Sequence, residues 1–64
     1  MNVKELRTKL RLSQVKFCLT YKIKLATLRN WEQGRNKPRK WSLSYLTIIA
    51  AFPEKVADVI KQRY

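Results

Sequence analysis

Apolar residues recur along this chain at the three- and four-residue spacing of short amphipathic helices. The first such segment carries Val3, Leu6 and Leu10 on one helical face, and Asn2 in front of it suits an N-cap. No stretch alternates apolar and polar residues as a strand does, and no segment is repeated. The pattern therefore predicts an all-α fold.

A second helix is predicted after Ser13, whose side chain suits an N-cap. Its inward face carries Phe17, Cys18 and Tyr21, and the cysteine supplies a small side chain where the next helix must approach closely. The turn that follows contains no glycine, so we expect Lys22 to adopt a left-handed or near-bridge backbone conformation. For a residue other than glycine this conformation costs on the order of 1 kcal/mol.

The third helix is predicted over residues 25–33, with Leu28 and Trp31 pointing inward. Gly34 is placed to end this helix in the left-handed conformation. Residues 35–40 are expected to form a basic loop, since the proline within them disfavours helical continuation. The second and third helices are therefore predicted to form a pair joined by a tight turn.

Two further helices are predicted in the C-terminal part of the chain. The fourth spans residues 41–52, capped by Ser42 or Ser44, and the fifth begins at Pro53, which suits the first turn of a helix. Their expected inward side chains are Leu43, Leu46, Ile49 and Ala50 in the fourth helix and Val56, Val59 and Ile60 in the fifth. We therefore expect a single domain over residues 1–64, built from five short helices.

Positive charge is concentrated in the N-terminal two thirds of the chain. The whole chain has 15 Lys and Arg against 4 Asp and Glu, a net charge of +11. Residues 1–41 hold 12 of the basic and 2 of the acidic residues, a net of +10, which leaves +1 for residues 42–64. A polyanion partner explains this asymmetry, because neutralising phosphates releases counterions. We expect nucleic acid rather than an anionic membrane or an acidic protein, because the bulky apolar residues that a membrane helix needs are committed to the core.

Composition excludes several classes of function. The chain has no histidine, one cysteine and one glycine, so metal-site spacings, glycine-rich phosphate loops and histidine-based triads are absent. We therefore expect no enzyme, no metal and no cofactor. A lone cysteine cannot form an internal disulfide, which fits a reducing compartment. The longest apolar run, residues 48–53, is far shorter than a membrane span of about 20 residues, and the polar N-terminus is unlike a signal peptide, so a cytoplasmic location is expected.

Four short motifs resemble one known family. They are Leu-Ser-Gln at 12–14, Phe-Cys at 17–18, Thr-Leu-Arg-Asn-Trp-Glu-Gln-Gly-Arg at 27–35 and Lys-Pro at 37–38. Together they are similar to the Cro/phage-repressor (XRE) helix-turn-helix family, which has the lambda-repressor-like DNA-binding fold. The nearest group is that of HigA-like antitoxins and small phage or plasmid autoregulators. This chain departs from the family at Lys22, where glycine is usual, and at Lys24, where Ser, Thr or Asp usually caps the recognition helix.

The resemblance implies that the third helix is a recognition helix that reads bases in the DNA major groove. The family positions that read bases fall on Leu25, Ala26, Arg29 and Asn30, and Thr27 is a further candidate for a base or phosphate contact. The guanidinium of Arg29 can bond guanine bidentately, and the amide of Asn30 can read adenine. Three of these residues keep an alternative: Leu25 as half-buried packing, Thr27 as an ordinary surface residue, and Asn30 as a residue directed at phosphate or water.

The residues around the recognition helix are expected to hold DNA phosphates. The expected set is Gln14, Lys16, Lys22, Lys24, Arg35, Asn36, Lys37, Arg39 and Lys40. By resemblance, Glu32 forms a structural ion pair with Arg7, which prevents an unpaired carboxylate from repelling DNA. Trp41 has two interpretations, a cap on the core beneath the basic loop or a residue beside the DNA backbone.

The sequence therefore indicates a sequence-specific, double-stranded DNA-binding transcription regulator. The resemblance implies an autorepressor encoded by a bacterium or phage and associated with the nucleoid. One such domain reads few base pairs, so we expect a homodimer on a palindromic operator, joined through the nearly neutral fourth and fifth helices. The alternatives are an antitoxin whose main role is to bind and neutralise a toxin, and a non-specific nucleic-acid coat.

Overall fold

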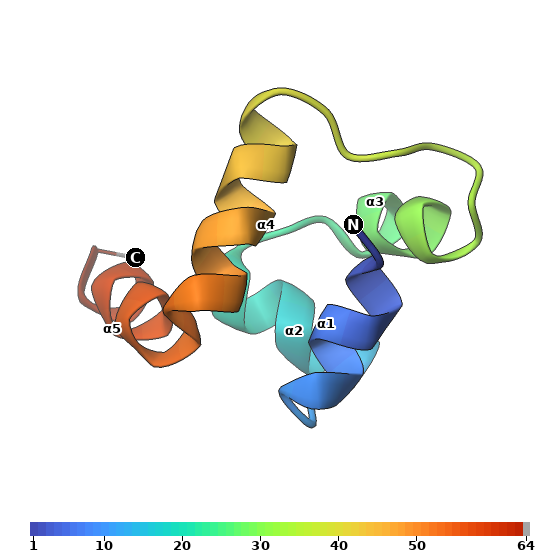
Figure 1. The fold of residues 1–64 in the computed structure, drawn as a ribbon. Coiled ribbons are helices and arrows are strands. Elements are labelled where there is room, and N and C mark those ends of the chain that lie inside the picture. The colour runs from blue at the N-terminus through green and yellow to red at the C-terminus, as the bar shows by residue number, and fades with distance from the viewer. Residues whose placement is uncertain (64) are drawn as a thin grey trace.

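Five α-helices follow one another in the computed structural model, which describes residues 1–63 (Figure 1). They are α1 (Val3–Lys9), α2 (Gln14–Tyr21), α3 (Leu25–Glu32), α4 (Trp41–Ala51) and α5 (Pro53–Arg63). The described part of the chain contains no strand, so the predicted all-α fold is confirmed. The helices α3 and α4 each end one residue earlier than predicted.

The helix α2 lies at the centre of the molecule. It packs against α3 and against α5, while α1 packs on α3 and α4 packs on α5. In Figure 1, α4 and α5 stand on one side of α2, and α1 and α3 stand on the other. The pair α2–α3 is therefore supported on both sides by helices that lie outside it.

Polar side chains begin the first two helices as predicted. Asn2 Oδ1 accepts a hydrogen bond from the backbone N–H of Glu5 at 2.9 Å, and Ser13 Oγ accepts one from that of Lys16 at 3.1 Å. An N-cap bond of this kind is worth about 1 kcal/mol. Lys24, which precedes α3, makes no such side-chain bond. The start of α3 therefore depends on packing rather than on a cap.

Eight buried side chains from α1 to α4 form the core. They are Val3, Leu6, Phe17, Cys18, Tyr21, Leu28, Leu46 and Ile49. Full burial of a Leu, Ile or Phe side chain contributes about 1.5–3 kcal/mol relative to exposure. Cys18 is one of the eight, as predicted, and burial raises the pKa of its thiol. The cysteine is thus part of the packing between α2 and its neighbours.

Two tyrosine hydroxyls connect α2 to the C-terminal helices. The hydroxyl of Tyr21 donates to the carbonyl of Pro53 at 2.9 Å, and the hydroxyl of Tyr45 donates to the carbonyl of Tyr21 at 2.7 Å. The ring of Tyr21 also packs on Phe17, with the ring centroids 5.1 Å apart. The end of α2 is therefore fixed to both α4 and α5 by directional bonds as well as by packing.

The predicted serine cap of α4 is wrong. The helix begins at Trp41, and Lys40 occupies the N-cap position with φ 50° and ψ −123° and no side-chain cap bond. Ser42 and Ser44 lie inside the helix, where their backbone N–H groups donate to the carbonyls of Arg39 and Lys40. The loop thus enters the helix one residue before the first serine. Backbone in this region suits glycine, and for lysine it costs about 1–3 kcal/mol.

Three residues predicted to face inward are exposed instead. Leu43 is 40% exposed, Val59 is 52% exposed, and Ala50 is exposed as well. The N-terminal turns of α4, which carry Leu43, extend beyond α2 and α5 in Figure 1, and Leu43 borders an open pocket that Trp31 of α3 also lines. In α5 the contacts with the core are made by Val56, Ala57 and Ile60 instead of Val59.

The turn between α2 and α3 has the predicted left-handed residue. Lys22 has φ 57° and ψ 51°, and the next backbone N–H, that of Ile23, donates to the carbonyl of Cys18 at 3.1 Å. The same carbonyl also accepts from the N–H of Lys22, so two backbone bonds close the end of α2. Lysine therefore occupies a position where the backbone conformation favours glycine.

We expect Lys22→Gly to raise the free energy of unfolding by about 1 kcal/mol, because glycine adopts the left-handed conformation without the steric cost. Urea denaturation followed by circular dichroism measures the change. Lys22→Ala is the matched control: it removes the charge, keeps the Cβ atom, and should not stabilise. An equal gain in both variants would assign the effect to charge instead of the backbone.

Candidate nucleic-acid interface

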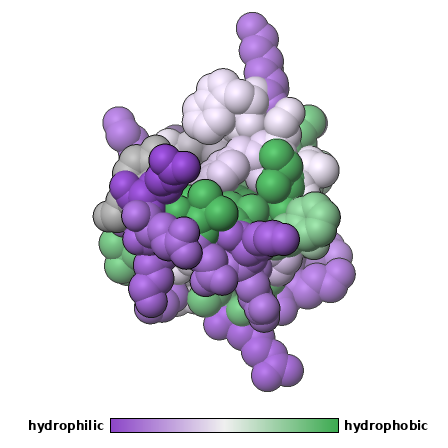
Figure 2. All heavy atoms as spheres, turned by 90° about the vertical axis from the view of Figure 1, so that its left-hand side faces the viewer, coloured by the Kyte–Doolittle hydropathy of each residue, from purple (hydrophilic) through white to green (hydrophobic). Residues whose placement is uncertain are grey.

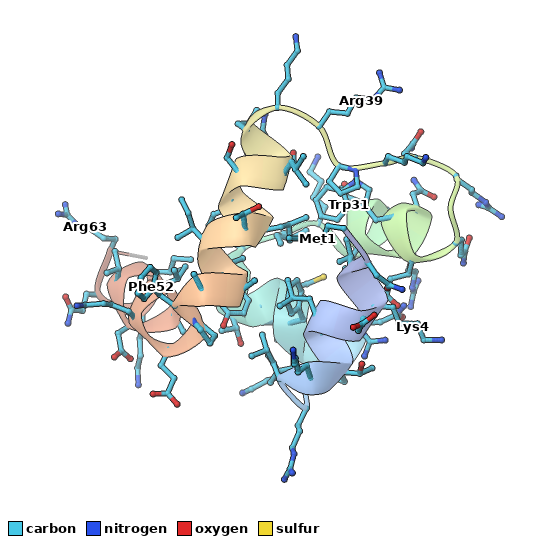
Figure 3. All side chains as sticks on the ribbon, viewed as in Figure 1. Met1, Lys4, Trp31, Arg39, Phe52 and Arg63 are labelled. Atoms are coloured by element: carbon cyan, nitrogen blue, oxygen red, sulfur yellow. The ribbon has the colours of Figure 1, made fainter. Side chains whose placement is uncertain are left out.

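One buried leucine anchors α3 and leaves its opposite face open. Leu28 is fully buried, and Trp31 is partly buried against the core, as the helical spacing predicted. Figure 3 shows Trp31 between α3 and α4, under the loop that joins them. The inward side of α3 is therefore occupied by packing, and the outward side is available for a partner.

The residues predicted to read bases differ in their exposure. Ala26 and Arg29 are exposed, whereas Leu25, Thr27 and Asn30 are partly buried. Leu25 packs against the core, which supports its packing alternative over direct base contact. Gln33, at the C-terminal end of α3, is exposed too, although it is not among the predicted base-reading residues. Arg29 is thus the charged side chain that α3 presents on its outward face.

A left-handed glycine fixes the exit from α3. Gly34 has φ +77°, and its N–H donates to the carbonyl of Trp31 at 3.3 Å. The N–H of Arg35 donates to the carbonyl of Asn30 at 3.0 Å. These two bonds form a Schellman motif, which satisfies the last carbonyls of the helix. The basic loop therefore leaves α3 in a defined direction.

The predicted phosphate-binding cations are all exposed. They are Lys16 on α2, Lys22 and Lys24 in the turn, and Arg35, Lys37, Arg39 and Lys40 in the loop; Asn36 is also exposed. Side chains of the loop line an open groove of ≈ 740 Å³ together with Thr27 of α3 and Ser42 of α4. Figure 3 shows Arg39 extending from the loop into open space. Cations therefore lie both before and after α3 along the chain.

Three helices meet at the carboxylate of Glu32. Arg7 of α1 binds it with two hydrogen bonds, Nε to Oε2 at 2.7 Å and Nη2 to Oε1 at 3.0 Å. Gln14, at the start of α2, donates from Nε2 to Oε1 of the same carboxylate at 3.2 Å. The Nη1 of Arg7 donates to the carbonyl of Leu12 at 2.8 Å. The ion pair that the family resemblance implied is therefore present, within a larger network.

The ion pair between Arg7 and Glu32 is mostly buried, and it shifts the pKa values of both side chains. The side chains of Arg7 and Glu32 are only 12% and 6% exposed. The hydrogen bonds from Arg7 lower the pKa of Glu32 below its ordinary value of 4.5, and the carboxylate in turn raises the pKa of Arg7. Glu32 therefore stays ionised at neutral pH, and its charge is balanced by Arg7.

Gln14, which was predicted to contact a DNA phosphate, is also bonded within the protein. Its side-chain amide has two N–H donors, and one of them is bonded to Glu32. The bond orients the amide at the N-terminus of α2 and leaves the other N–H for an external acceptor such as a phosphate. No sequence signal identified this bond, because glutamine rotamers do not follow from spacing.

Other kinds of site find no support in the described residues. No group of three or more His, Cys, Asp or Glu side chains there could hold a metal ion. No helix among residues 1–63 is long and apolar enough to cross a membrane.

We expect Arg7→Ala to lower the free energy of unfolding at neutral pH by about 3 kcal/mol, because it leaves the Glu32 carboxylate buried without its cation. A group whose pKa is depressed by folding stabilises the protein above its ordinary pKa and loses that contribution in acid. The difference between wild type and variant should therefore shrink as the pH falls from 4.5 through the lowered pKa of Glu32. Urea denaturation across pH measures it, with exposed Lys9→Ala as the control. A pH-independent difference would contradict the assignment.

Comparison with known proteins places this geometry in a family. The fold matches the crystal structure of an HTH XRE-family-like protein from Agrobacterium tumefaciens with a TM-score of 0.90 and 44% sequence identity. The match covers 92% of this chain and 95% of that chain. No protein-family profile and no curated protein matches the chain. Because the identity extends over nearly all of both chains, the chain belongs to the XRE family of helix-turn-helix proteins.

Proposed function

We propose that this protein is a sequence-specific, double-stranded DNA-binding transcription regulator that inserts α3 into the major groove. The observation that carries the proposal is the outward face of α3, where Arg29 is exposed while Leu28 is fully buried. An arginine on a firmly anchored helix can reach guanine edges with two hydrogen bonds. Ala26 beside it leaves room for close approach to the bases.

The surrounding charge supports the same partner. Exposed cations of the turn precede α3 and those of the loop follow it, so they can contact phosphates on either side of the groove. Phosphate contacts set the position of the helix, whereas base contacts set the sequence that it reads. The internal pairing of Glu32 with Arg7 keeps its negative charge from opposing this approach. These features favour a DNA regulator over a protein whose main role is to neutralise a toxin.

We expect Arg29→Ala to weaken binding to the preferred duplex by about 1–3 kcal/mol and to relax base preference at one position. Selection from a random duplex library defines the preferred sequence, and titration at two salt concentrations then measures affinity and salt slope. Arg63→Ala is the matched control, since Arg63 lies on α5 at the other side of the molecule (Figure 3). Selection that enriches no sequence would contradict the proposal, as would equal effects of the two variants.

We further propose that two copies pair through the open face of α4 and α5 to bind a palindromic operator. This face is an apolar groove of ≈ 330 Å³ lined by Tyr45, Ile48, Phe52, Lys55, Val56, Val59 and Ile60. Figure 2 shows apolar side chains in the middle of this side of the molecule, with hydrophilic side chains mainly below them and side chains of intermediate hydropathy above. In a two-fold dimer the same surface patch of both copies meets, so the patch must be complementary to itself. An apolar patch fulfils this condition, because it can pack against the same apolar patch of the second copy.

Charge and size support a second copy as the occupant of this face. Residues 42–64 have a net charge of +1, whereas residues 1–41 have +10, so two copies meet here with little repulsion. The molecule measures 32 × 22 × 21 Å. Two copies side by side can therefore separate their α3 helices by about the 34 Å of one DNA turn. By analogy with small family members, we propose that the dimer represses its own promoter, which a reporter fused to that promoter would test.

We expect Phe52→Ser to raise the dimer dissociation constant by about tenfold or more, since burying a phenylalanine contributes about 1.5–3 kcal/mol. Sedimentation equilibrium measures it. Phe52 is 60% exposed, so the substitution should leave the monomer folded. Leu19→Ser is the matched control, because Leu19 is 63% exposed but lies on α2, outside this face. A monomeric wild type, or an equal effect of both variants, would refute pairing through this face.

A further inference from the structure

Trp41 is a large apolar side chain that the fold leaves in solvent. It is 76% exposed, more than any other large apolar residue of the described chain. It belongs neither to the buried core nor to the partly buried residues that pack against it. Of the two sequence interpretations of Trp41, the cap on the core is therefore wrong, because the exposed indole covers none of it.

Trp41 begins an apolar stripe along α4. Tyr45, Ile48 and Phe52 follow it at spacings of four, three and four residues, so the four side chains share one face of the helix. The last three also line the apolar groove between α4 and α5. Ile48 is 52% exposed and Phe52 is 60% exposed, so most of the stripe is open to a partner.

Charge is absent from α4 but present beyond both of its ends. None of the 11 residues of the helix is charged, although the chain has a net charge of +11. The exposed cations Arg39 and Lys40 directly precede the helix. The first six residues of α5, which follow it, carry Glu54, Lys55 and Asp58, a net charge of −1. The stripe is thus bounded by a positive end and a slightly negative end.

These charges distinguish the two ways in which the stripes of two copies can face each other. In a parallel pair, the cations Arg39 and Lys40 of both copies would meet at one end, together with the like ends of two helix dipoles. In an antiparallel pair, the cations of each copy approach the negative end of the other copy's α4 dipole. The 11 residues of α4, at 1.5 Å each, then hold the two groups of cations about 16 Å apart. Electrostatics therefore favours the antiparallel pair.

The antiparallel register also matches the side chains of the stripe. When Trp41 of one copy lies opposite Phe52 of the second copy, Tyr45 lies opposite Ile48, so every member of the stripe has an apolar counterpart. Two-fold symmetry requires this reciprocity, since each contact of residue i with residue j is repeated as j with i.

We propose that two α4 helices pair antiparallel, and that the indole of Trp41 of each copy enters the apolar groove of the other copy beside its Phe52. An aromatic side chain that fills a pocket of the partner is the kind of residue that dominates an interface. The inference rests on the proposed pairing of two copies. It adds the side chain that fills the groove and the orientation in which the copies meet.

The first test measures the dimer dissociation constants of wild type, Trp41→Ala and Leu43→Ala by sedimentation equilibrium. We expect Trp41→Ala to raise the constant about tenfold or more. Leu43→Ala is the matched control, since Leu43 lies on the same helix but two residues away, on another face, and should leave the constant unchanged. Acrylamide quenching gives a second readout. The emission of Trp41, isolated by comparing wild type with Trp41→Phe, should become shielded as rising protein concentration forms the dimer.

The second test determines the orientation. Chains that carry Trp41→Cys or Phe52→Cys are treated, separately and as a mixture, with a thiol cross-linker shorter than α4, at a concentration above their dissociation constants. We expect cross-linked dimers from the mixture and far fewer from either variant alone, because equal positions lie at opposite ends of an antiparallel pair. The native Cys18 is buried, and mass spectrometry of the joined peptides identifies which positions reacted.

Each other outcome is decisive. If Phe52→Ser weakens the dimer but Trp41→Ala does not, or if either cysteine variant alone cross-links as readily as the mixture, the inference is refuted and pairing through this face stands. An indole that is shielded from acrylamide only when duplex is added would assign Trp41 to the DNA backbone and also refute the inference. If wild type stays monomeric, the proposed pairing and this inference fail together.

Discussion

The position of α3 depends on the carboxylate of Glu32. It accepts two hydrogen bonds from Arg7 of α1 and one from Gln14 of α2, so a single side chain joins the first three helices. A carboxylate buried this far is tolerated because a guanidinium balances its charge and its oxygens are hydrogen-bonded. The same bonds that secure α3 also direct the amide of Gln14. Stability and the arrangement of the outward surface are thus linked through one group.

The molecule divides its surface by chemistry around a thin core. Eight buried residues from α1 to α4 hold the domain together, and α5 supplies no fully buried side chain. The attachment of α5 rests on half-buried contacts and on the hydroxyl of Tyr21. Cations gather on the side of α2 and α3, and apolar side chains remain open on the side of α4 and α5. The two sides of the molecule therefore differ in the chemistry that they expose.

Local signals in the sequence predicted local structure well. The caps at Asn2 and Ser13, the left-handed Lys22 and the glycine that ends α3 each depend on a few neighbouring atoms. Helical spacing also separated the buried Leu28 from the exposed Arg29. These features could be predicted because hydrogen bonds and sterics within one turn decide them.

Features that depend on distant packing were missed. Leu43 has the right spacing for a core residue, but it lies on the turns of α4 that extend beyond α2 and α5, and it stays 40% exposed. The serine cap of α4 failed because the loop path, which the sequence does not reveal, starts the helix at Trp41. The bond from Gln14 to Glu32 depends on a side-chain rotamer. Spacing predicts which residues share a face, but not what that face meets.

The burial of Cys18 has a practical consequence. Its thiol lies in the core with a raised pKa, so little of it is in the reactive thiolate form while α2 stays packed. Because this is the only cysteine of the chain, alkylation of a thiol can occur at one side chain only. The rate of that alkylation therefore reports how often local unfolding exposes the thiol, so it measures the opening of the core without any added label.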